Sequence, residues 1–373
     1  MNQPVVAIAH QTIIEGDAIG NDICGMYKTL LDQGYNVGLI AEFTEKSIKQ
    51  FQLSSLQINQ FLKNKDAVLI YHQSINWEWG EELLKKFKGK VIFKYHNITP
   101  ARHFKAFSSV HYGKCLQGSE QTKRFINTYK KSKWMADSIF NSLQLHEMGL
   151  PQEQTIVVPP FNRFETLEKI EPDYKIIESL ISNRCNNVLF VGRVAPNKGH
   201  VHLIKTIKIY KELYDPNVHL WIVGSIDHDQ LKSYYNQLLE IIRKYGLEKN
   251  ISFVDKIPEN AMKSYYLGCD EFLCMSEHEG FCVPVIEAQR NQLPVITYGD
   301  TALKETAGKN QIVLDELDYD FAASALYTIY TDDKVRKFCI KNGQANINSR
   351  FSTEIIQSNF LSAFKLASEG EYQ

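Results

Sequence analysis

The stretch NVLFVGRVAPNKGH, residues 187–200, carries the strongest evidence for the fold of this chain. Its first five residues predict a buried β-strand, Gly192 predicts a tight turn, and the residues after Gly199 continue with helical periodicity to about residue 213. A strand, a glycine turn and a helix in this order form the first half of a βαβ unit. Repeated βαβ units build a doubly wound parallel sheet.

The same alternation extends in both directions from this stretch. Further strands are predicted at 5–9, 36–41, 67–71, 91–95, 133–136 and 155–158, and then at 219–223, 251–254, 271–275, 294–297 and 311–314. Helical patterns are predicted at 21–33, 54–64, 79–88, 200–213, 230–245, 283–291, 319–331 and 352–367. Near-continuous apolar strands that alternate with helices indicate parallel sheets covered on both faces.

The pattern is interrupted once, after Val158, where Pro159-Pro160-Phe161 is followed by a polar stretch that runs to about residue 187. A chain of 373 residues is also too long for one ordinary core. We therefore expect a Rossmann-like domain over 1–170, a second over 185–350, and a terminal helix in 351–373 that packs back toward the first domain. Two such domains usually hold a ligand in the cleft between them, where the carboxyl ends of their strands face each other.

Charge is distributed unevenly along the sequence. The formal net charge is −1, which argues against a protein coated for polyanion binding. Residues 1–150 carry 18 basic and 13 acidic side chains, whereas the rest carry 24 and 30. The first half is therefore basic by +5 and the second acidic by −6, which predicts different partners for the two halves.

Composition also restricts the cellular setting. The seven cysteines form no CxxC pair, so they indicate reduced, mostly buried thiols rather than disulfides or a zinc site. No apolar run approaches about 18 residues, so no membrane span is predicted, and the first residues read as a strand rather than a signal peptide. We expect a cytoplasmic protein, with any membrane contact made at the surface of the inner face.

The first chemical motif lies in the opening stretch. Gly192 lets the backbone approach closely after the strand, and Arg193 and Lys198 can converge at the start of the following helix. Two cations, free N–H groups and a helix dipole together predict a site for a phosphate-like anion. The alternative is an ordinary turn with two solvated cations.

The second motif is MSEHEGFCVPVIEA, residues 275–288, which follows a strand and opens a helix with Pro284 in its first turn. Glu279 lies in the loop, and Glu287 lies about one turn into the helix. A carboxylate can accept hydrogen bonds from two vicinal hydroxyls, which is how proteins commonly hold a ribose or sugar diol. The alternative makes Glu279 a helix-capping acid and Glu287 a solvated side chain.

Together the two motifs resemble those of retaining glycosyltransferases of family 4, which have the GT-B fold of two Rossmann-like domains. That family shows a G-R…K-G segment followed by S-x-x-E-G-F-x-x-P-x-x-E-A. This chain has the second pattern at Ser276, Glu279, Gly280, Phe281, Pro284, Glu287 and Ala288. The resemblance is close over residues 185–310 and rests on the strand and helix pattern elsewhere.

The resemblance implies a role for each matching residue. Arg193 and Lys198 would neutralise the donor diphosphate, Glu287 would bind the ribose hydroxyls, and Glu279 would hold the donor sugar beside the reacting carbon. Other donor contacts are implied at Gly192, Gly224, Ile257, Gly280, Phe281, Cys282, Val283 and Glu305. Of these, the backbone of Ile257 would read the nucleobase.

In the first domain the resemblance points to His96, at the end of the strand 91–95, as a residue that faces the sugar or the reaction centre. A lone histidine is otherwise more often structural, and His72 has a weaker case. The family also has a glycine-rich loop after its first strand, and this chain matches that loop only loosely. The family's usual Gly-Gly pair is replaced here by Ile19-Gly20-Asn21. Gly20 and Asp22 remain as candidate donor or acceptor contacts.

Residues 102–133 interleave eight Lys and Arg side chains with five aromatic ones. This pattern is typical of an anionic membrane surface contact or of nucleic-acid binding, and equally of an ordinary amphipathic helix. Related enzymes often use lipid-linked acceptors, so peripheral membrane contact through the basic N-terminal domain is preferred, and no nucleic acid is expected.

These observations predict a retaining hexosyltransferase that uses a nucleoside diphosphate sugar, with UDP favoured, and a glycan or lipid-linked acceptor of polysaccharide or glycoconjugate synthesis. Neither a metal nor a cofactor is expected, because the sequence contains no HExxH or CxxC motif and cations can meet the diphosphate charge. Two alternatives stay open: a nucleotide-sugar epimerase on the same fold, and a catalytically silent nucleotide- or carbohydrate-binding module.

Overall fold

The computed structural model describes residues 5–369 and divides the chain into two compact units. The first unit contains residues 1–98, 114–162 and 351–373, and the second contains 99–113 and 163–350. Residues 1–4 and 370–373, the ends of the predicted first domain and terminal segment, lie outside the described residues. Each unit is described below by itself.

The first unit is built on a parallel sheet in which the described strands follow the order β3-β1-β5-β6-β7-β8. These strands are β1 (Val5–Ala9), β3 (Asn36–Ile40), β5 (Val68–Gln73), β6 (Lys90–Tyr95), β7 (Lys133–Ala136) and β8 (Thr155–Val157). A small parallel pair, β2 (Thr12–Ile13) and β4 (Phe43–Thr44), stands beside it. The strand order has its switch point between β1 and β5, because the chain places β3 on one side of β1 and β5 on the other. Doubly wound sheets bind ligands at such a point.

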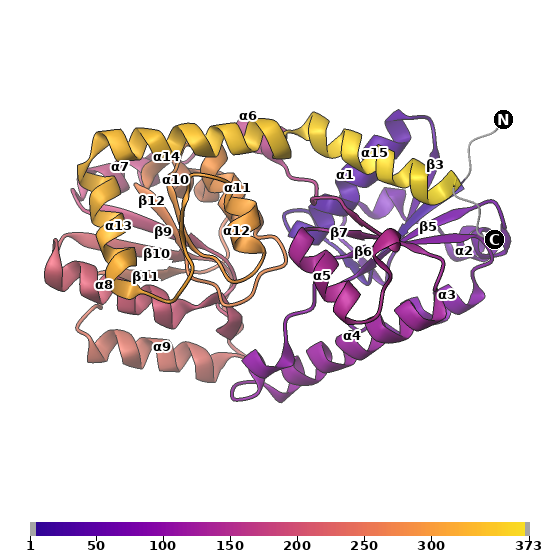
Figure 1. The fold of residues 1–373 in the computed structure, drawn as a ribbon, viewed down its shortest axis with the longest axis horizontal. Coiled ribbons are helices and arrows are strands. Elements are labelled where there is room, and N and C mark those ends of the chain that lie inside the picture. Colours follow the sequence, from indigo (N-terminus) through magenta and orange to yellow (C-terminus); the bar gives the residue numbers. More distant parts are fainter. Residues whose placement is uncertain (1–4, 370–373) are drawn as a thin grey trace. The chain divides into compact units, whose positions relative to one another are not determined.

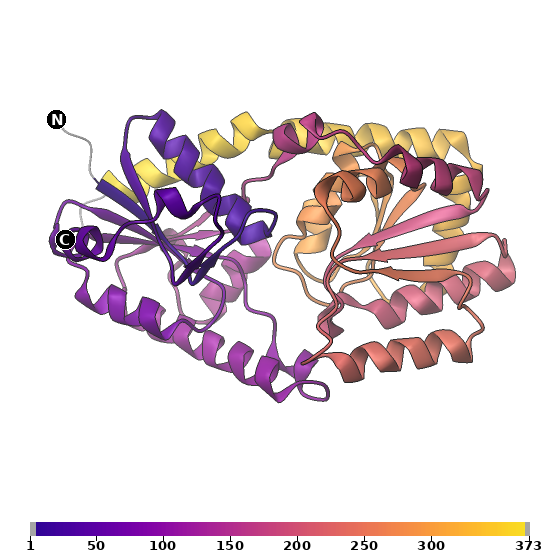
Figure 2. The same cartoon turned by 180° about the vertical axis from the view of Figure 1, so that it is seen from behind.

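Helices cover both faces of this first sheet, as Figures 1 and 2 show. They are α1 (Ala18–Asp32), α2 (Ser55–Lys63), α3 (Glu78–Lys86), α4 (Ser109–Thr128), α5 (Ile139–Glu147) and α15 (Thr353–Glu369). The last of these comes from the end of the chain and packs on α1 and β6. Its buried side chains include Ile356, Phe360 and Phe364, at helical spacing along one face.

The second unit repeats the architecture with the strand order β11-β10-β9-β12-β13-β14. The bounds are β9 (Asn186–Val191), β10 (Val218–Val223), β11 (Ile251–Val254), β12 (Glu271–Cys274), β13 (Val295–Tyr298) and β14 (Ile312–Leu314). All described pairings in it are parallel, so every strand delivers its carboxyl end to the same edge of the sheet. The switch point of this sheet lies between β9 and β12, the two strands that precede the sequence motifs.

The helices of the second unit are α6 (Phe164–Lys169), α7 (Tyr174–Ser182), α8 (His200–Leu213), α9 (Lys232–Lys244), α10 (Glu259–Gly268), α11 (Val283–Arg290), α12 (Ala302–Ala307), α13 (Tyr319–Thr331) and α14 (Asp333–Asn346). Figure 1 shows α8 and α9 on one side of the sheet and α10 on the other. An apolar core of strand and helix residues fills the space between them. Among the described residues of either unit, no helix is long and apolar enough to cross a membrane.

The expected two-sheet α/β fold is therefore present, but the structure draws the unit boundaries differently. Residues 99–113, assigned by prediction to the first domain, group with the second unit, because Phe107 packs edge-on against Tyr234 and His111 pairs with Asp227. The polar stretch that follows Pro159-Pro160-Phe161 also contains a helix. This helix, α7, packs on α10, with Leu180 buried against Gly268. Its apolar residues recur every three to four positions, a signal that the polar flanks hid.

The basic and aromatic residues of 102–133 follow the ordinary amphipathic pattern. Phe104 and Phe125 are buried, whereas Lys114, Lys123 and Arg124 are exposed. The rings therefore serve the cores, and the cations face water.

One buried acid gives the fold a pH dependence. Glu271, at the start of β12, is fully buried. Burial, with Asp270 beside it, raises the pKa of Glu271 well above the ordinary value, and Arg336 offsets only part of this. Because the folded-state pKa lies above the unfolded value of 4.5, this carboxyl favours the folded state fully below pH 4.5. That contribution is lost as the pH rises from there through the folded-state pKa.

We expect Glu271→Gln, which stays neutral at every pH, to raise the free energy of unfolding at pH 8 by about 1–3 kcal/mol, the usual scale for an imperfectly compensated buried polar group. At pH 4.5 the variant and the native protein should be nearly equal. Urea unfolding at the two pH values measures the difference, with the exposed Glu248→Gln as control. An equal gain at both pH values would contradict this account of Glu271.

Candidate functional site

The loop that follows β9 is shaped by Gly199, which begins α8 in a left-handed conformation with φ of 67°. A side chain here would place its Cβ 1.9 Å from the carbonyl oxygen of Met275, so only glycine lets this loop lie against the end of β12. The contact brings the G-R…K-G segment next to the loop 275–282. The two sequence motifs therefore meet at the carboxyl edge of the second sheet, as their strand positions predict.

Lys198 and Glu279 form the centre of this meeting point. The Lys198 Nζ lies 2.7 Å from Oε1 and 2.9 Å from Oε2 of Glu279, and the two side chains are 19% and 9% exposed. Burial by itself would lower the pKa of Lys198, but the Glu279 carboxylate outweighs it and raises that pKa. The ammonium is therefore charged across the physiological range. Arg193 is exposed on the same loop.

The loop that carries Glu279 is held by hydrogen bonds on two sides. The carbonyl oxygen of Asn197 accepts bonds from the backbone N–H groups of Glu277 and His278, and the Asn197 side chain donates to the His278 carbonyl. On the other side, the Glu279 N–H donates to Thr301 Oγ1 at 3.3 Å. These bonds fix the position of the Glu279 backbone before any ligand is bound.

The residues after Glu279 lead directly into α11. Phe281 and Cys282 are buried, Gly280 and Val283 are partly exposed, and the Phe281 carbonyl accepts a bond from Thr306 Oγ1 at 2.6 Å. Cys282 adopts a left-handed conformation with φ of 75°, which is uncommon for a residue with a Cβ. This turn directs the first N–H groups of α11 toward the carboxyl edge of the sheet, where an anion would be stabilised.

Glu287 lies one turn into α11, as the sequence predicts. It accepts a hydrogen bond from the Tyr266 hydroxyl at 2.8 Å, and burial raises its pKa. Glu287 is partly exposed, and its carboxylate is held by Tyr266 rather than left to solvent alone. Tyr266 was missed by the sequence analysis, because one tyrosine in α10 carries no pattern that separates it from its neighbour Tyr265.

The remaining predicted donor residues of the second unit lie at the same edge. Gly224, with φ of 148°, follows β10 so closely against Gly192 that a Cβ would meet the Gly192 carbonyl oxygen at 2.3 Å. Ile257 follows β11 and is partly buried, and Glu305 is partly exposed in the first turn of α12 after β13. The structure therefore brings the predicted donor residues of this unit to the ends of five neighbouring strands.

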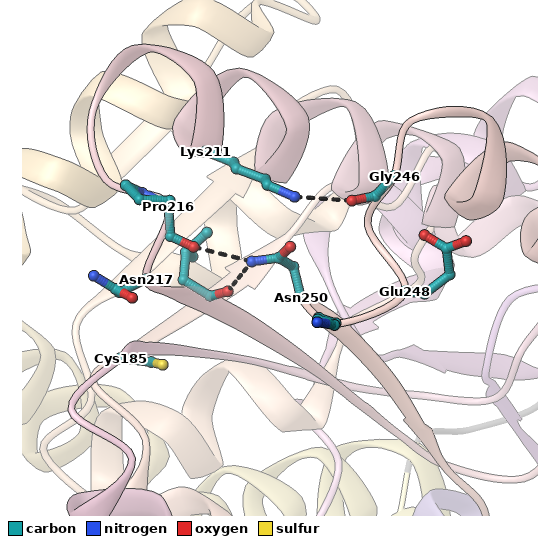
Figure 3. A pocket seen from close by; sticks show the side chains of 9 residues that line it. Cys185, Lys211, Pro216, Asn217, Gly246, Glu248 and Asn250 are labelled. Carbon is teal, nitrogen blue, oxygen red and sulfur yellow. Dashed lines mark hydrogen bonds between the residues drawn. The ribbon is translucent and has the colours of Figure 1, made fainter.

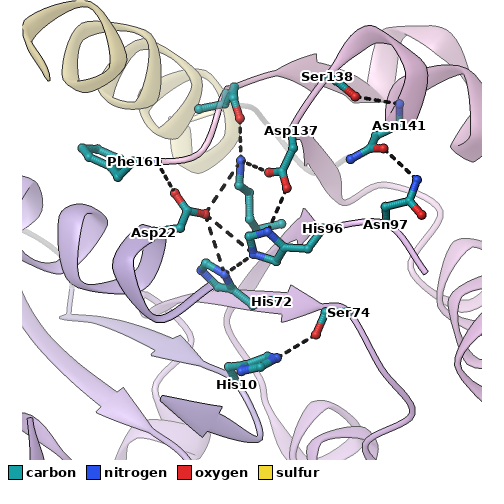
Figure 4. Close-up of polar contacts among 12 residues, drawn as sticks. His10, Asp22, His72, Ser74, His96, Asn97, Asp137, Ser138, Asn141 and Phe161 are labelled. Atoms are coloured by element: carbon teal, nitrogen blue, oxygen red, sulfur yellow. Dashed lines mark hydrogen bonds and ion pairs between the residues drawn. The ribbon is translucent and has the colours of Figure 1, made fainter. Parts of the chain in front are cut away.

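In the first unit, His96 follows β6 and lies in a buried polar cluster with Asp22, His72 and Asp137 (Figure 4). Lys94 belongs to the same cluster through its ion pair with Asp137. Both ring nitrogens of His96 have partners there: Nδ1 is 2.9 Å from Asp137 Oδ2, and Nε2 is 2.7 Å from His72 Nδ1. Asp22 is fully buried in the same cluster rather than placed on the surface of the loop.

Gly20 is buried in the first turn of α1, where a Cβ would meet the Ile14 carbonyl oxygen at 1.8 Å. Close packing of the loop on the helix is therefore enough to explain glycine at this position. A donor contact by Gly20 stays a prediction.

Two groups of described residues have the donor atoms for a metal ion, namely Asp22, His72 and His96, and Cys274, Glu279 and Cys282. An ammonium lies beside the carboxylate of each group: Lys94 Nζ is 3.9 Å from Asp22 Oδ2, and Lys198 is paired with Glu279. A fixed cation so close disfavours a second, divalent one.

A cavity of about 600 Å³ lies at the opposite edge of the second sheet (Figure 3). It is lined by residues that precede the strands, including Cys185, Asn217 and Asn250, and by Lys211 of α8. The Lys211 ammonium donates to the Gly246 carbonyl and Asn250 to those of Pro216 and Val218, so these polar groups serve the fold. None of the predicted donor residues lines this cavity.

Comparison with known proteins finds relatives that are named glycosyltransferases. The family model for glycosyl transferases group 1 matches residues 175–346. The capsular polysaccharide biosynthesis glycosyltransferase CapH of Staphylococcus aureus is 30% identical over 285 residues, which is 76% of this chain and 72% of CapH. CapM of the same organism is 26% identical over 217 residues, and that match spans about half of CapM, 54%.

Solved structures show the same fold at low identity. Anabaena HepE in complex with UDP-glucose gives a TM-score of 0.73 at 17% identity, covering 96% of this chain and 99% of HepE. WaaG, a glycosyltransferase involved in lipopolysaccharide biosynthesis, gives a TM-score of 0.66 at 14% identity and covers 98% and 100%. The predicted GT-B fold is confirmed.

Proposed function

The chain belongs to the group 1 glycosyl transferases, and on this premise we propose that it moves a hexose from a UDP-sugar to a glycan or lipid-linked acceptor in polysaccharide or glycoconjugate synthesis, with retention at the anomeric carbon. The observation that carries the proposal is the buried Lys198–Glu279 pair, held between the ends of β9 and β12. The similarity to CapH and CapM, both named for capsular polysaccharide biosynthesis, supports the class of product.

The donor diphosphate binds at the cationic side of the site. Lys198 turns from Glu279 toward the phosphate oxygens, and the flexible Arg193 approaches from the exposed side of the loop. As the bond between the sugar and the diphosphate breaks, negative charge grows on the leaving oxygen, and the Lys198 ammonium stabilises it in a site with little water. These cations supply the charge stabilisation.

The sugar and ribose bind at the acidic side. Glu279, released from Lys198, accepts hydrogen bonds from sugar hydroxyls, and its carboxylate favours positive charge at the anomeric carbon. Glu287 accepts from the two ribose hydroxyls, with Tyr266 holding one of its oxygens in place at 2.8 Å. A UDP donor is supported by the UDP-glucose that HepE holds, and in this chain the backbone of Ile257 is the candidate contact for the base.

Retention follows if the acceptor attacks from the face that the diphosphate leaves. A phosphate oxygen then takes the proton of the acceptor hydroxyl, so no separate protein base is required. The first unit supplies the acceptor side. Its exposed cations suit an anionic or lipid-linked acceptor at a membrane surface, and the location that fits them is the cytoplasmic side of a membrane.

UDP is expected to stabilise the protein, because ligand that binds only the folded state at about 100 times its Kd adds about 2.7 kcal/mol. Thermal unfolding of the full chain with and without UDP measures this shift. Glu287→Ala should abolish most of it by removing the ribose contact, whereas Glu240→Ala, an exposed acid of the same unit, should leave it unchanged. A UDP shift that survives in Glu287→Ala would contradict the assignment of Glu287.

A further inference from the structure

The end of β6 holds a lysine in a setting where charges are rare. Lys94 lies in β6 between the core residues Phe93 and Tyr95, and its side chain is 0% exposed. Its ammonium is 2.6 Å from Asp137 Oδ1, 2.5 Å from the Val158 carbonyl oxygen and 3.9 Å from Asp22 Oδ2. A core that served only stability would be at least as stable with apolar residues in place of both Lys94 and Asp137.

The contacts of Asp137 show what the lysine does. One carboxylate oxygen of Asp137 forms an ion pair with the Lys94 ammonium. The other lies 2.9 Å from His96 Nδ1 (Figure 4). A carboxylate can only accept a hydrogen bond, so Nδ1 of His96 must carry the proton. His96 is therefore held in one tautomer by an anion that is itself fixed by a buried cation.

The opposite side of His96 is equally constrained. Its Nε2 lies 2.7 Å from His72 Nδ1 and 3.7 Å from Asp22 Oδ2, and Asp22 Oδ1 accepts a bond from the Phe161 N–H. Two nitrogens at this distance share one proton in a hydrogen bond. Because Nδ1 of His96 is bonded to Asp137, Nε2 is the nitrogen of His96 that can exchange its partner. The side chain of His96 is 5% exposed at the strand end, whereas that of His72 is 0% exposed.

The groups that face His96 come from every element packed around it. They are Asp22 on α1, His72 on β5, Lys94 on β6 and Asp137 after β7, with His10 after β1 behind His72 at 6.4 Å between ring centres. The Lys94 ammonium is paired with Asp137, and burial raises the pKa of Asp22 above its ordinary value. Burial lowers the pKa of His10 to about 4, so His10 is neutral near neutral pH.

The backbone next to His96 is also fixed. Asn97 takes a left-handed conformation with φ of 69°, and its side chain donates to Asn141 Oδ1 at 2.8 Å and to Gln144 Oε1 at 2.7 Å. The chain therefore turns away from the sheet directly after His96. A strained residue held by such bonds is typical of a side chain whose position matters for function.

We propose that Asp137, clamped by Lys94, is a positioning residue that sets the tautomer and orientation of His96 for sugar transfer. The proposal rests on the function proposed above and on the expectation from the sequence that His96 faces the sugar or the reaction centre. His96 presents Nε2 to a substrate hydroxyl, which takes the place of His72, while Nδ1 stays bonded to Asp137.

The test is Asp137→Asn in the full chain, with UDP release from UDP-glucose as the activity. An asparagine keeps the size of the side chain but can present its amide to His96, which permits the wrong tautomer. We expect kcat to fall by about 10- to 100-fold, as for partners that orient other histidine ligands, with KM for UDP-glucose changed less than about twofold. The pH profile of kcat should shift as well, which a purely structural role would not cause. Asp66→Asn, an exposed change in the same unit, is the matched control.

The 15N NMR signals of His96 give a readout that does not depend on activity. In the native protein Nδ1 should show the protonated shift near neutral pH, and this signal should change in Asp137→Asn. An unchanged kcat in folded Asp137→Asn, or an unprotonated Nδ1 in the native protein, would overturn the proposal. So would activity that requires added Zn²⁺ and is lost in Asp22→Asn, since that would make the cluster a metal centre. A native protein that releases UDP from no donor would instead overturn the proposed function.

Discussion

Replacing Lys198 by alanine is expected to lower the rate of UDP release from UDP-glucose by about 100- to 1,000-fold, the effect of removing one preorganised charge-stabilising group. The ammonium is partly buried and its carboxylate partner raises its pKa, so it is charged in the free protein and available to the leaving diphosphate. The loss should appear mainly in kcat, because negative charge on the leaving oxygen is largest in the transition state.

The matched control is Lys244→Ala, which removes an exposed lysine of α9 in the same unit. Its kcat and KM should equal those of the native protein. Circular dichroism and thermal unfolding should show that Lys198→Ala is folded. A kcat within about threefold of the native value in Lys198→Ala would remove the central cation from the mechanism.

The second large effect concerns stability. Lys94→Met is expected to lower the free energy of unfolding by about 3–5 kcal/mol, because removing one partner of a buried ion pair leaves the other charge uncompensated. Here Asp137 would lose its contact at 2.6 Å, and Asp22 would lose its nearest ammonium. Urea unfolding followed by tryptophan fluorescence measures the loss, since Trp134 lies in β7 of the same unit.

A double variant separates the charge effect from the loss of packing. In Lys94→Met/Asp137→Asn the neutral amide replaces the stranded carboxylate, so part of the lost stability should return, and the two changes should be strongly non-additive. If the double variant is less stable than the sum of the single effects, the buried pair does not account for the stability of this cluster.

Much of the second unit could be predicted because its chemistry follows the chain. Arg193 and Lys198 come directly after one strand and Glu279 after another, and parallel strands bring such ends to one edge. The position of Glu287 one turn into its helix also followed from spacing alone. The Tyr266 contact could not be predicted in this way, because it joins residues on two helices whose packing the sequence pattern does not specify.

The polar cluster of the first unit was harder to predict for a physical reason. Its members come from four separate elements, and Asp137 carries no local pattern that distinguishes it from a surface aspartate. One signal was present in Lys94, a charged residue inside an otherwise apolar strand, which is rare unless the charge is paired. The boundaries of the units were misjudged for a related reason, since residues 99–113 join the second unit through Phe107 and His111.

The most direct test of the central claim is UDP, GDP or ADP release from a panel of nucleoside diphosphate sugars by the purified full chain. Slow hydrolysis by water reports donor chemistry even when the acceptor is unknown. We predict turnover with a UDP-hexose that exceeds turnover with its GDP and ADP counterparts and is lost in Lys198→Ala. Failure to bind or hydrolyse any donor of the panel would contradict the assignment of this chain as a sugar transferase.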